Sequence, residues 1–574
     1  MYSNFILFAL FILVLLVIRK PLGAYIYKVY HNEKTWLDYF AKPLEYLFAK
    51  SLHVNLTKEQ TPKAYLSALL LFSLASFAFV YLILIFQGVL PLNPAGIANM
   101  SWDQAFNTAA SFVTNTNWQS YAGETGVSYF AQMAALAVQN FVSAAVGIAV
   151  VIALIRGISR YHEKTIGNFW YDISKAIFWL LLPFCIVIAL IYIFQGVPQN
   201  ILAYFHIHTL AGTEQIIPQG PIASQEAIKS LGTNGGGFFN ANSAHPYENP
   251  TILTNFLQVI SIFAIPVALT YTFGKYVNNA KQGWFIFVVM LVLFIVSLSI
   301  MTMAELHGPN FYGAHTLTDM YGQTHHLANM EGKEVRFGIF HSTLYNTVST
   351  AASDGGVNSV IDSYTPIGGM MAMINMALGE VIFGGIGAGL YGFLMFMMLS
   401  VFIASLMIGR IPSFLGKRIQ GTEMKWVMLT LLISPCCVLM FSAIAFVYPD
   451  IKASLTNSGA HGFSEILYAY ISAANNNGSA FAGLNANTPF LNVTLGIAML
   501  LGRFVTIFAV IMLSGSLVMK KRASEGSSYT SLATTSVVFG ALVIFTILIV
   551  GGLTIFPALA IGPILDHLML ATAL

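Results

Sequence analysis

The chain has 574 residues, of which 57% are hydrophobic and 9% are charged, and its formal net charge is +3. Soluble proteins carry about 25% charged residues, so this composition excludes a soluble enzyme and indicates an integral membrane protein. A lipid bilayer is its expected surrounding, and no nucleic-acid partner is expected. The three cysteines, Cys185, Cys436 and Cys437, lie in apolar runs without metal-ligand spacing and are expected to be packing residues.

Apolar runs long enough to span a membrane recur along the chain. They lie at roughly 4–18, 65–87, 128–155, 176–195, 252–273, 284–304, 370–408, 426–448, 490–518 and 534–556. Most contain about 20 residues or more, which as a helix cross a hydrocarbon layer of about 30 Å. The first run has no basic segment before it and no cleavage site after it, so it is expected to be retained. The sequence therefore predicts an all-α integral membrane protein with about ten transmembrane helices.

Four short polar strips interrupt the apolar pattern at nearly equal spacing. They read Thr114-Asn115-Thr116-Asn117, Thr233-Asn234-Gly235-Gly236, Ser353-Asp354-Gly355-Gly356 and Asn475-Asn476-Asn477-Gly478. A hydroxyl residue precedes each strip by three positions (Ser111, Ser230, Thr350 and Ser472), at intervals of 119, 120 and 122 residues. This spacing predicts four pseudo-symmetric repeats of helix, pore helix, strip and helix, as in the potassium-channel and Trk-like superfamily.

The repeats divide the chain into seven expected parts. These are an N-terminal transmembrane helix (1–20), a cytoplasmic segment (21–64), four repeats (65–160, 174–275, 282–412 and 424–520) and a C-terminal transmembrane helix (530–574). The last helix of the third repeat is expected to be broken.

The strips have the chemistry of a binding site for a dehydrated monovalent cation, which makes them a predicted selectivity filter. Thr, Ser and Asn supply side-chain oxygens, and glycine permits the dihedral angles that turn successive carbonyls inward. Only Asp354 is acidic, whereas a tight Ca²⁺ or Mg²⁺ site needs more carboxylates, so K⁺ is the favoured ion and the only metal expected. Serines before the strips are expected to cap the pore helices, whose C-terminal ends would face the ion. These serines are Ser101, Ser224, Ser342 and Ser464.

The distribution of basic residues sets the expected orientation. With the N-terminus outside, 21 of the 26 Lys and Arg residues fall on the inner side, as the positive-inside rule requires. All four strips then face the outside, where 14 acidic residues would concentrate cations near the entrance.

Glycines and buried charges below the predicted filter indicate a gate or tunnel. The third repeat contains the run Gly379-Glu380-Val381-Ile382-Phe383-Gly384-Gly385-Ile386-Gly387-Ala388-Gly389, which predicts a helix break in mid-membrane. Glu380, Gly384 and Gly385 are gate candidates, with close helix packing as the alternative. Arg503 either repels K⁺ from the inner exit or pairs with Glu380. Arg410, a further candidate, lies nearer the inner boundary and is expected to extend its head group towards water.

With their flanking residues, the strips resemble those of a known family. Phe112-Val113-Thr114-Asn115-Thr116-Asn117-Trp118-Gln119-Ser120-Tyr121 is similar to the first filter of the potassium-binding A subunit of Kdp potassium pumps. Gly232-Thr233-Asn234-Gly235-Gly236-Gly237-Phe238-Phe239-Asn240-Ala241-Asn242 with His245-Pro246 resembles the second, and Ala473-Ala474-Asn475-Asn476-Asn477-Gly478-Ser479-Ala480-Phe481 the fourth. The third region, Thr350-Ala351-Ala352-Ser353-Asp354-Gly355-Gly356-Val357-Asn358, matches in outline, but Asp354 departs from the neutral or cysteine residue expected there. The resemblance covers essentially the whole chain.

The resemblance implies a role in the ATP-driven uptake of scarce K⁺. The A subunit would form the outer, selective entrance, with Gln119 beside the filter, and K⁺ would leave sideways through an intersubunit tunnel. The implied partners are a P-type ATPase B subunit and small C and F membrane subunits in the bacterial inner membrane. The chain has no P-loop and no Asp-Lys-Thr-Gly phosphorylation motif, so it is expected to be non-catalytic and without a cofactor of its own. ATP and Mg²⁺ would be used by the partner.

Two other functions stay open. A stand-alone K⁺ or Na⁺ transporter of the Trk or HKT type would share the fourfold plan, but not the long Asn- and Gly-rich filter sequence. A membrane-embedded hydrolase with a metal site would use histidines of the third repeat, although no HExxH motif accompanies them. These histidines are His307, His315, His325, His326 and His341.

Overall fold

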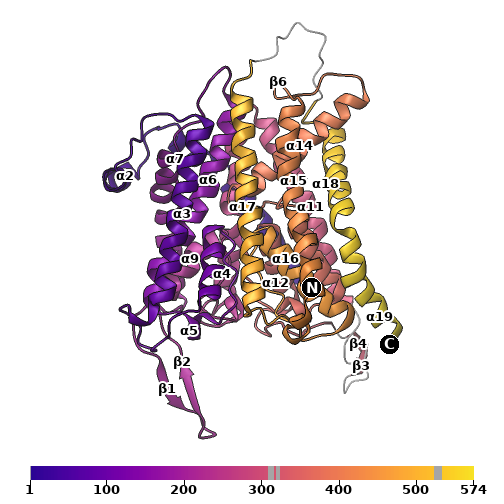
Figure 1. The fold of residues 1–574 in the computed structure, drawn as a ribbon. Coiled ribbons are helices and arrows are strands. Elements are labelled where there is room, and N and C mark those ends of the chain that lie inside the picture. Colours follow the sequence, from indigo (N-terminus) through magenta and orange to yellow (C-terminus); the bar gives the residue numbers. More distant parts are fainter. Residues whose placement is uncertain (1, 308–315, 319–323, 327, 522–532, 574) are drawn as a thin grey trace.

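The computed structural model describes residues 2–307, 316–318, 324–326, 328–521 and 533–573. The expected segment ends at residues 1, 530 and 574, and the loop histidine His315, lie outside the described residues. Within the described part, ten helices are long and apolar enough to cross a membrane, which agrees with the number predicted. They stand side by side in a bundle (Figure 1), so the chain is an all-α, multi-pass membrane protein.

The elements follow the expected fourfold order. α1 (Tyr2–Tyr30) and α2 (Asp38–Ser51) come first. The next elements are α3 (Pro62–Phe86), η1 (Gln87–Val89), α4 (Trp102–Val113), α5 (Gly123–Gly126), η2 (Ala131–Ala137) and α6 (Val138–Ser159). They are followed by α7 (Phe169–Lys175), η3 (Ala176–Leu181), α8 (Leu182–Phe194), α9 (Ile222–Leu231), η4 (Asn242–Ala244) and α10 (Ile252–Tyr276).

The second half of the chain repeats this pattern. Its third unit holds α11 (Ala280–His307), α12 (Gly338–Ala351), η5 (Ile361–Ser363), α13 (Pro366–Ala377) and α14 (Ala388–Met407). The fourth holds α15 (Gly421–Val447), η6 (Pro449–Ser454), α16 (Gly459–Ala474) and α17 (Pro489–Val518). α18 (Val537–Leu559), η7 (Ala560–Ile564) and α19 (Leu565–Ala573) complete the described part.

Three antiparallel two-stranded hairpins decorate the helices. They are β1 (Phe205–His208) with β2 (Glu214–Ile217), β3 (Thr316–Thr318) with β4 (Thr324–His326), and β5 (Ser413–Phe414) with β6 (Lys417–Arg418). β1 and β2 project from the lower end of the bundle in Figure 1, the end at which α4, α9, α12 and α16 also lie.

A Thr-Pro pair begins three of the helices that carry the repeats, α3, α13 and α17. The proline occupies the first helical position, where its missing N–H leaves no donor unsatisfied. The threonine Oγ1 accepts the N–H of the residue three positions later: Ala64 at 3.4 Å, Gly368 at 3.2 Å and Leu491 at 3.3 Å. These starts are therefore fixed by local sequence.

The predicted serine N-cap positions hold for only one of the four short helices. Ser101 occupies the N-cap position of α4, although its side chain makes no hydrogen bond to an N–H of that helix, and Ser224, Ser342 and Ser464 lie inside α9, α12 and α16. Their hydroxyls donate to preceding carbonyls, as Ser342 does to Gly338 at 2.8 Å and Ser464 to Ala460 at 3.0 Å. A serine hydroxyl can satisfy a helical carbonyl as readily as a terminal N–H, so the serines alone did not locate these helix starts.

The bundle surrounds α6. In its apolar window 89% of the residues are buried, against 22% in the peripheral α3, so α6 is enclosed by protein on nearly all sides. The apolar run of the third repeat is divided into α13 and α14, and residues 378–387 between them are not helical. Both features lie next to the ring described below.

Candidate functional site

The four short helices α4, α9, α12 and α16 end at equivalent residues. Their C-caps are Thr114, Gly232, Ala352 and Asn475. Four residues starting at each C-cap form one segment of a ring. We number these ring segments 1 to 4, and they contain residues 114–117, 232–235, 352–355 and 475–478. This alignment moves the predicted register of the second and third strips by one residue, because their equivalents of Thr114 are Gly232 and Ala352 and not Thr233 and Ser353.

Backbone conformation defines the register more sharply than residue type. In every ring segment the second and fourth residues have left-handed φ angles, from +46° to +99°: Asn115, Asn117, Thr233, Gly235, Ser353, Gly355, Asn476 and Gly478. Alternating right- and left-handed residues turn successive peptide carbonyls to the same side, the arrangement that coordinates a cation. Five of the eight are not glycine, and such backbone strain is typical of functional sites.

The ring segments contact one another in a closed cycle. A Cβ on Gly235 would lie 2.0 Å from the carbonyl oxygen of Asp354, which brings segments 2 and 3 together. A Cβ on Gly355 would lie 2.1 Å from the Asn477 oxygen, and one on Gly478 would lie 1.8 Å from the Thr116 oxygen. Segments 3, 4 and 1 are thereby joined in turn.

Side-chain amides reinforce the same cycle. Asn115 Nδ2 donates to the carbonyl of Thr233 at 2.7 Å, which closes the ring between segments 1 and 2. Asn476 Nδ2 donates to Thr116 Oγ1 at 3.0 Å, across segments 4 and 1. Gln119, predicted beside the filter, accepts the N–H of Gly237 at 2.9 Å and so holds the chain that leaves segment 2. The ring is bound together by its own polar groups, all of them buried or nearly so.

Four helix C-terminal ends meet at this ring. Because the negative end of a helix dipole lies at its C-terminus, α4, α9, α12 and α16 direct partial negative charge towards the centre. The ring adds backbone carbonyls to this partial negative charge. The first, second and fourth residues of every ring segment have no ionisable side chain. This arrangement can hold a weakly hydrated monovalent cation.

The sequence pattern missed Lys229. The backbone N–H at the third position of each segment bonds to the carbonyl of Ser111, Lys229, Ser349 or Ser472. Lys229 is therefore the structural equivalent of the anchoring serines, not its neighbour Ser230. A charged residue within an otherwise uncharged end of a pore helix was the available signal.

The gate candidates lie directly beside the ring. The N–H of Ile386, in the non-helical segment 378–387, donates to Thr233 Oγ1 at 2.8 Å. A Cβ on Gly385 would lie 2.9 Å from Glu380 Oε2 and 3.2 Å from the carbonyl oxygen of Ala352, and one on Gly384 would overlap the Glu380 backbone. The segment thus packs under ring segments 2 and 3. Glu380 also lines a cavity of about 60 Å³ with Asn475 and Asn476.

Arg503 is placed below the ring on α17. A Cβ on its neighbour Gly502 would lie 2.0 Å from the carbonyl oxygen of Ala474, the last residue of α16. Arg503 is 5% exposed, and its Nη2 has no hydrogen-bond partner in the described part of the chain. Among the residues that the structure describes, no carboxylate oxygen lies within 4.0 Å of its guanidinium, so a direct ion pair with Glu380 is not formed.

Arg410 does not belong to this site. It follows α14, is exposed, and donates its backbone N–H to Ser405 at 2.8 Å. The structure therefore brings together the strips, Gln119, Glu380, Gly384, Gly385 and Arg503, but leaves Arg410 at the far end of α14.

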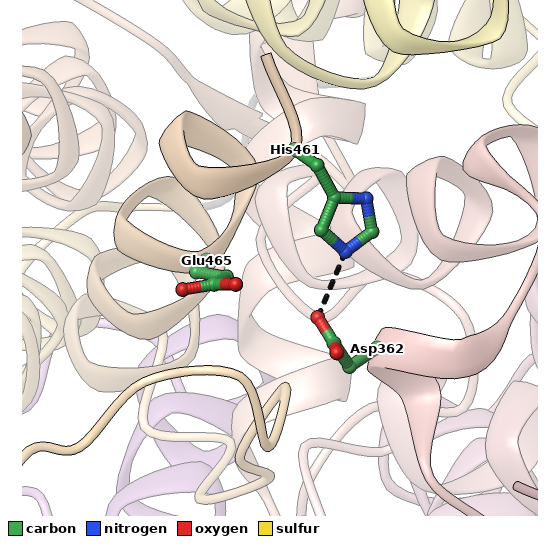
Figure 2. A group of neighbouring side chains, drawn as sticks. All are labelled: Asp362, His461 and Glu465. Atoms are coloured by element: carbon green, nitrogen blue, oxygen red, sulfur yellow. Dashed lines mark hydrogen bonds and ion pairs between the residues drawn. The ribbon is translucent and has the colours of Figure 1, made fainter. Parts of the chain in front are cut away.

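One group of acids and histidine among the described residues is close enough to hold a metal. Ligand atoms of Asp362, His461 and Glu465 lie within 4.8 Å of one another (Figure 2). However, His461 Nε2 already binds Asp362 at 2.9 Å and Nδ1 binds Asp566 at 2.8 Å. Glu465 accepts four hydrogen bonds from Thr456 and Asn457. These contacts favour a structural ion-pair cluster over a metal centre.

The His461 cluster makes a pH-dependent prediction. Both ring nitrogens face carboxylates, so the imidazolium with two N–H donors fits the geometry. Burial alone lowers the pKa of His461, but its bonds to Asp362 and Asp566 outweigh burial and raise it from 6.5 to about 10. A raised pKa gives stability that is complete below the unfolded value and is lost as pH rises through the folded value. His461→Gln is expected to destabilise the protein by about 2 kcal/mol at pH 6 and much less above pH 10.

Thermal unfolding of the purified protein across pH 6 to 10.5 measures this difference. His208→Gln, on the exposed strand β1, is the matched control and should change stability little at any pH. A His461→Gln effect that stays constant across the range would contradict the ionised cluster.

Comparisons with known proteins agree on one family. The family model described as the potassium-transporting ATPase A subunit matches residues 9–568. A relative from Francisella tularensis subsp. novicida (strain U112) is 69% identical over 570 residues, covering 99% of this chain and all of the relative. One from Clostridium botulinum (strain Alaska E43 / Type E3) is 49% identical over 568 residues, covering 97% and 98%. Both carry the name potassium-transporting ATPase potassium-binding subunit.

A solved structure supports the fold. The potassium transporter TrkH from Vibrio parahaemolyticus aligns with 80% of this chain and 86% of its own, with a TM-score of 0.51 and 14% sequence identity. At this identity the likeness concerns the fold alone, and it fits the predicted fourfold plan. The family match spans nearly all of the chain, with relatives at 69% and 49% identity, and the chain belongs to the family of potassium-transporting ATPase A subunits.

Proposed function

We propose that this chain is the K⁺-binding subunit of an ATP-driven K⁺ uptake pump. The observation that carries the proposal is the closed ring of four segments, in which alternating left-handed residues turn backbone carbonyls to one side. A ring of carbonyls replaces the hydration shell of K⁺ without the charge that a divalent cation needs. The names of the relatives add a K⁺-transporting ATPase as the setting.

The ring is the proposed entrance, and it faces the outside of a bacterial inner membrane. The skewed distribution of Lys and Arg supports this orientation. The helix C-termini and the neutral Thr, Ser, Asn and Gly residues give selectivity, and Gln119 fixes the chain after segment 2. The residues at the ring are proposed to bind K⁺ as cargo, not as a resident cofactor.

The energy is proposed to come from a partner. No P-loop and no Asp-Lys-Thr-Gly motif occur in the sequence, so ATP and Mg²⁺ would be used by a P-type ATPase B subunit. Small C and F membrane subunits are the proposed remaining partners. The non-helical segment 378–387 and Arg503 lie under the ring, which supports an exit that is lateral and gated, not straight through the bundle.

Ion-stimulated ATP hydrolysis by the complex that co-purifies with the full-length chain tests this function. Stimulation by micromolar K⁺ but not by Na⁺ is expected. A chain that purifies without ATPase activity and conducts K⁺ passively in liposomes would instead be a stand-alone transporter of the Trk or HKT type, and the partner-dependent function would be wrong.

A further inference from the structure

A buried lysine stands behind the ring with more acidic groups than it can neutralise. Lys229, on α9, is 1% exposed. Its three N–H groups are shared among four acceptors: Glu226 Oε2 at 2.9 Å, Glu248 Oε2 at 2.9 Å, Asn242 Oδ1 at 2.6 Å and Ser243 Oγ at 2.9 Å. Two buried carboxylates therefore already share this single ammonium group.

A third carboxylate, that of Asp354, faces the same group from ring segment 3. A Cβ on Gly356 would lie 2.7 Å from Asp354 Oδ2, 3.2 Å from Lys229 Cε and 3.2 Å from Tyr345 Oη. The three groups thus converge on one point behind the ring. Asp354 is fully buried, and its Oδ2 accepts the N–H of Gly356 at 2.9 Å. Its Oδ1 has no hydrogen-bond partner among the residues that the structure describes.

The elements packed around Lys229 contribute tyrosine hydroxyl groups to the cluster. Tyr345, on α12, donates its hydroxyl to Ser243 Oγ at 2.9 Å. Tyr192, on α8, is a further uncharged neighbour of Glu226. Among the described residues that form this cluster, Lys229 is the one basic group beside the three carboxyl groups of Glu226, Glu248 and Asp354. Burial raises the pKa of Glu226 and of Asp354, so a cation bound nearby favours their ionised forms.

We propose that Asp354 sets the affinity of the ring for K⁺, because its carboxylate supplies negative charge that Lys229 cannot neutralise and the bound cation can. The inference rests on the proposed K⁺ function. The Asp354 carbonyl lies in the ring against Gly235, so its side chain is only a few bonds from the ion path. The carboxylate acts on the ion by its electrostatic field and does not coordinate it, because Oδ2 accepts the N–H of Gly356 behind ring segment 3.

Two of the other ring segments have an uncharged asparagine at the position equivalent to Asp354. Asn234 and Asn477 are the third residues of segments 2 and 4, as Asp354 is of segment 3. Asn477 Oδ1 accepts the N–H of Ser479 at 3.0 Å, the same turn that Asp354 makes with Gly356. Asparagine can therefore replace Asp354 with its backbone bond intact, and the substitution removes charge with little change of shape.

Asp354→Asn in the purified complex is the direct test, read out as ATP hydrolysis against K⁺ concentration. The half-saturating K⁺ concentration is expected to rise about tenfold, while the maximal rate stays near that of the wild type. Asp450→Asn, at an exposed acid of η6, is the control and should leave the half-saturating concentration unchanged. An unchanged value in Asp354→Asn would overturn the proposal, and so would a loss confined to the maximal rate.

Moving the charge distinguishes a field effect from a structural one. Asn477→Asp combined with Asp354→Asn places one carboxylate at the equivalent position of segment 4, and it should return the half-saturating concentration towards the wild-type value. If Asp354→Asn does not assemble, Asn477→Asp alone should lower the half-saturating concentration, and no change would overturn the proposal. A wild-type complex that does not respond to K⁺ at all would instead defeat the proposed function itself.

Discussion

Replacing Gly235 by alanine is expected to abolish K⁺-stimulated ATP hydrolysis at physiological K⁺ concentrations. Gly235 has φ +76°, and a Cβ there would lie 2.0 Å from the carbonyl oxygen of Asp354 and 2.9 Å from Gly355 Cα. Backbone atoms of another ring segment cannot yield as a flexible side chain does. Overpacking and a left-handed alanine together cost about 3–4 kcal/mol, which predicts an increase in half-saturating K⁺ of about 10²- to 10³-fold.

Gly338→Ala separates ring closure from backbone strain. Gly338, at the start of α12, has φ +69°, but a Cβ there has no heavy atom within 4 Å. This variant bears the same left-handed strain without a collision, so it should lose a little stability and keep its response to K⁺. The measurement is ATP hydrolysis against K⁺ concentration for both variants in the intact complex. Equal losses in the two would show that Gly235 matters only for folding, and the ring would not be the K⁺ site.

The spanning helices could be predicted from sequence because a bilayer makes length and apolarity sufficient signals. Ten apolar runs correspond to ten long helices, and Thr-Pro pairs mark three of their starts. The short helices were harder, since they are buried in protein and their serines can bond either to a free N–H or to a helical carbonyl. Ser224, Ser342 and Ser464 take the second option, so local sequence did not fix these starts.

In the second and third repeats, the ring segment begins one residue before the predicted strip, because side-chain type does not determine the backbone conformation there. The spacing of hydroxyl side chains predicts that Ser230 and Thr350 are the equivalents of Ser111. The ring instead depends on backbone φ angles, and a left-handed residue can be Asn, Thr, Ser or Gly. Lys229 and Ser349 hold the equivalent backbone positions. The charge of Lys229 is an unusual feature for a pore-helix end, but the side chain of Ser349 gives no sign of its position. Contacts between repeats, such as that of Gly235 with Asp354, cannot be read from the spacing of one chain.

Arg503→Met is expected to open a passive K⁺ leak through the chain. Arg503 lies below the ring, beside Gly502, which contacts the end of α16. Its Nη2 has no hydrogen-bond partner, and no acid within 4.0 Å among the described residues neutralises it. A unit charge within several ångströms of the ion path, at an effective dielectric of about 20, raises the energy of K⁺ by about 2–3 kcal/mol. Its removal should therefore increase ATP-independent K⁺ flux by about 50-fold.

Flux of K⁺ into proteoliposomes without ATP is the measurement, and Arg503→Lys is the matched control. Lysine keeps the positive charge but loses the guanidinium shape. If the charge forms the barrier, Arg503→Lys should therefore still prevent the K⁺ leak. If the residue serves only packing between α17, α6 and segment 378–387, both variants should lose stability and neither should leak. A barrier of this kind would explain how the ring serves an energised partner: K⁺ that enters the ring would meet a fixed cation on the straight path and would have to leave sideways, as the proposed function requires.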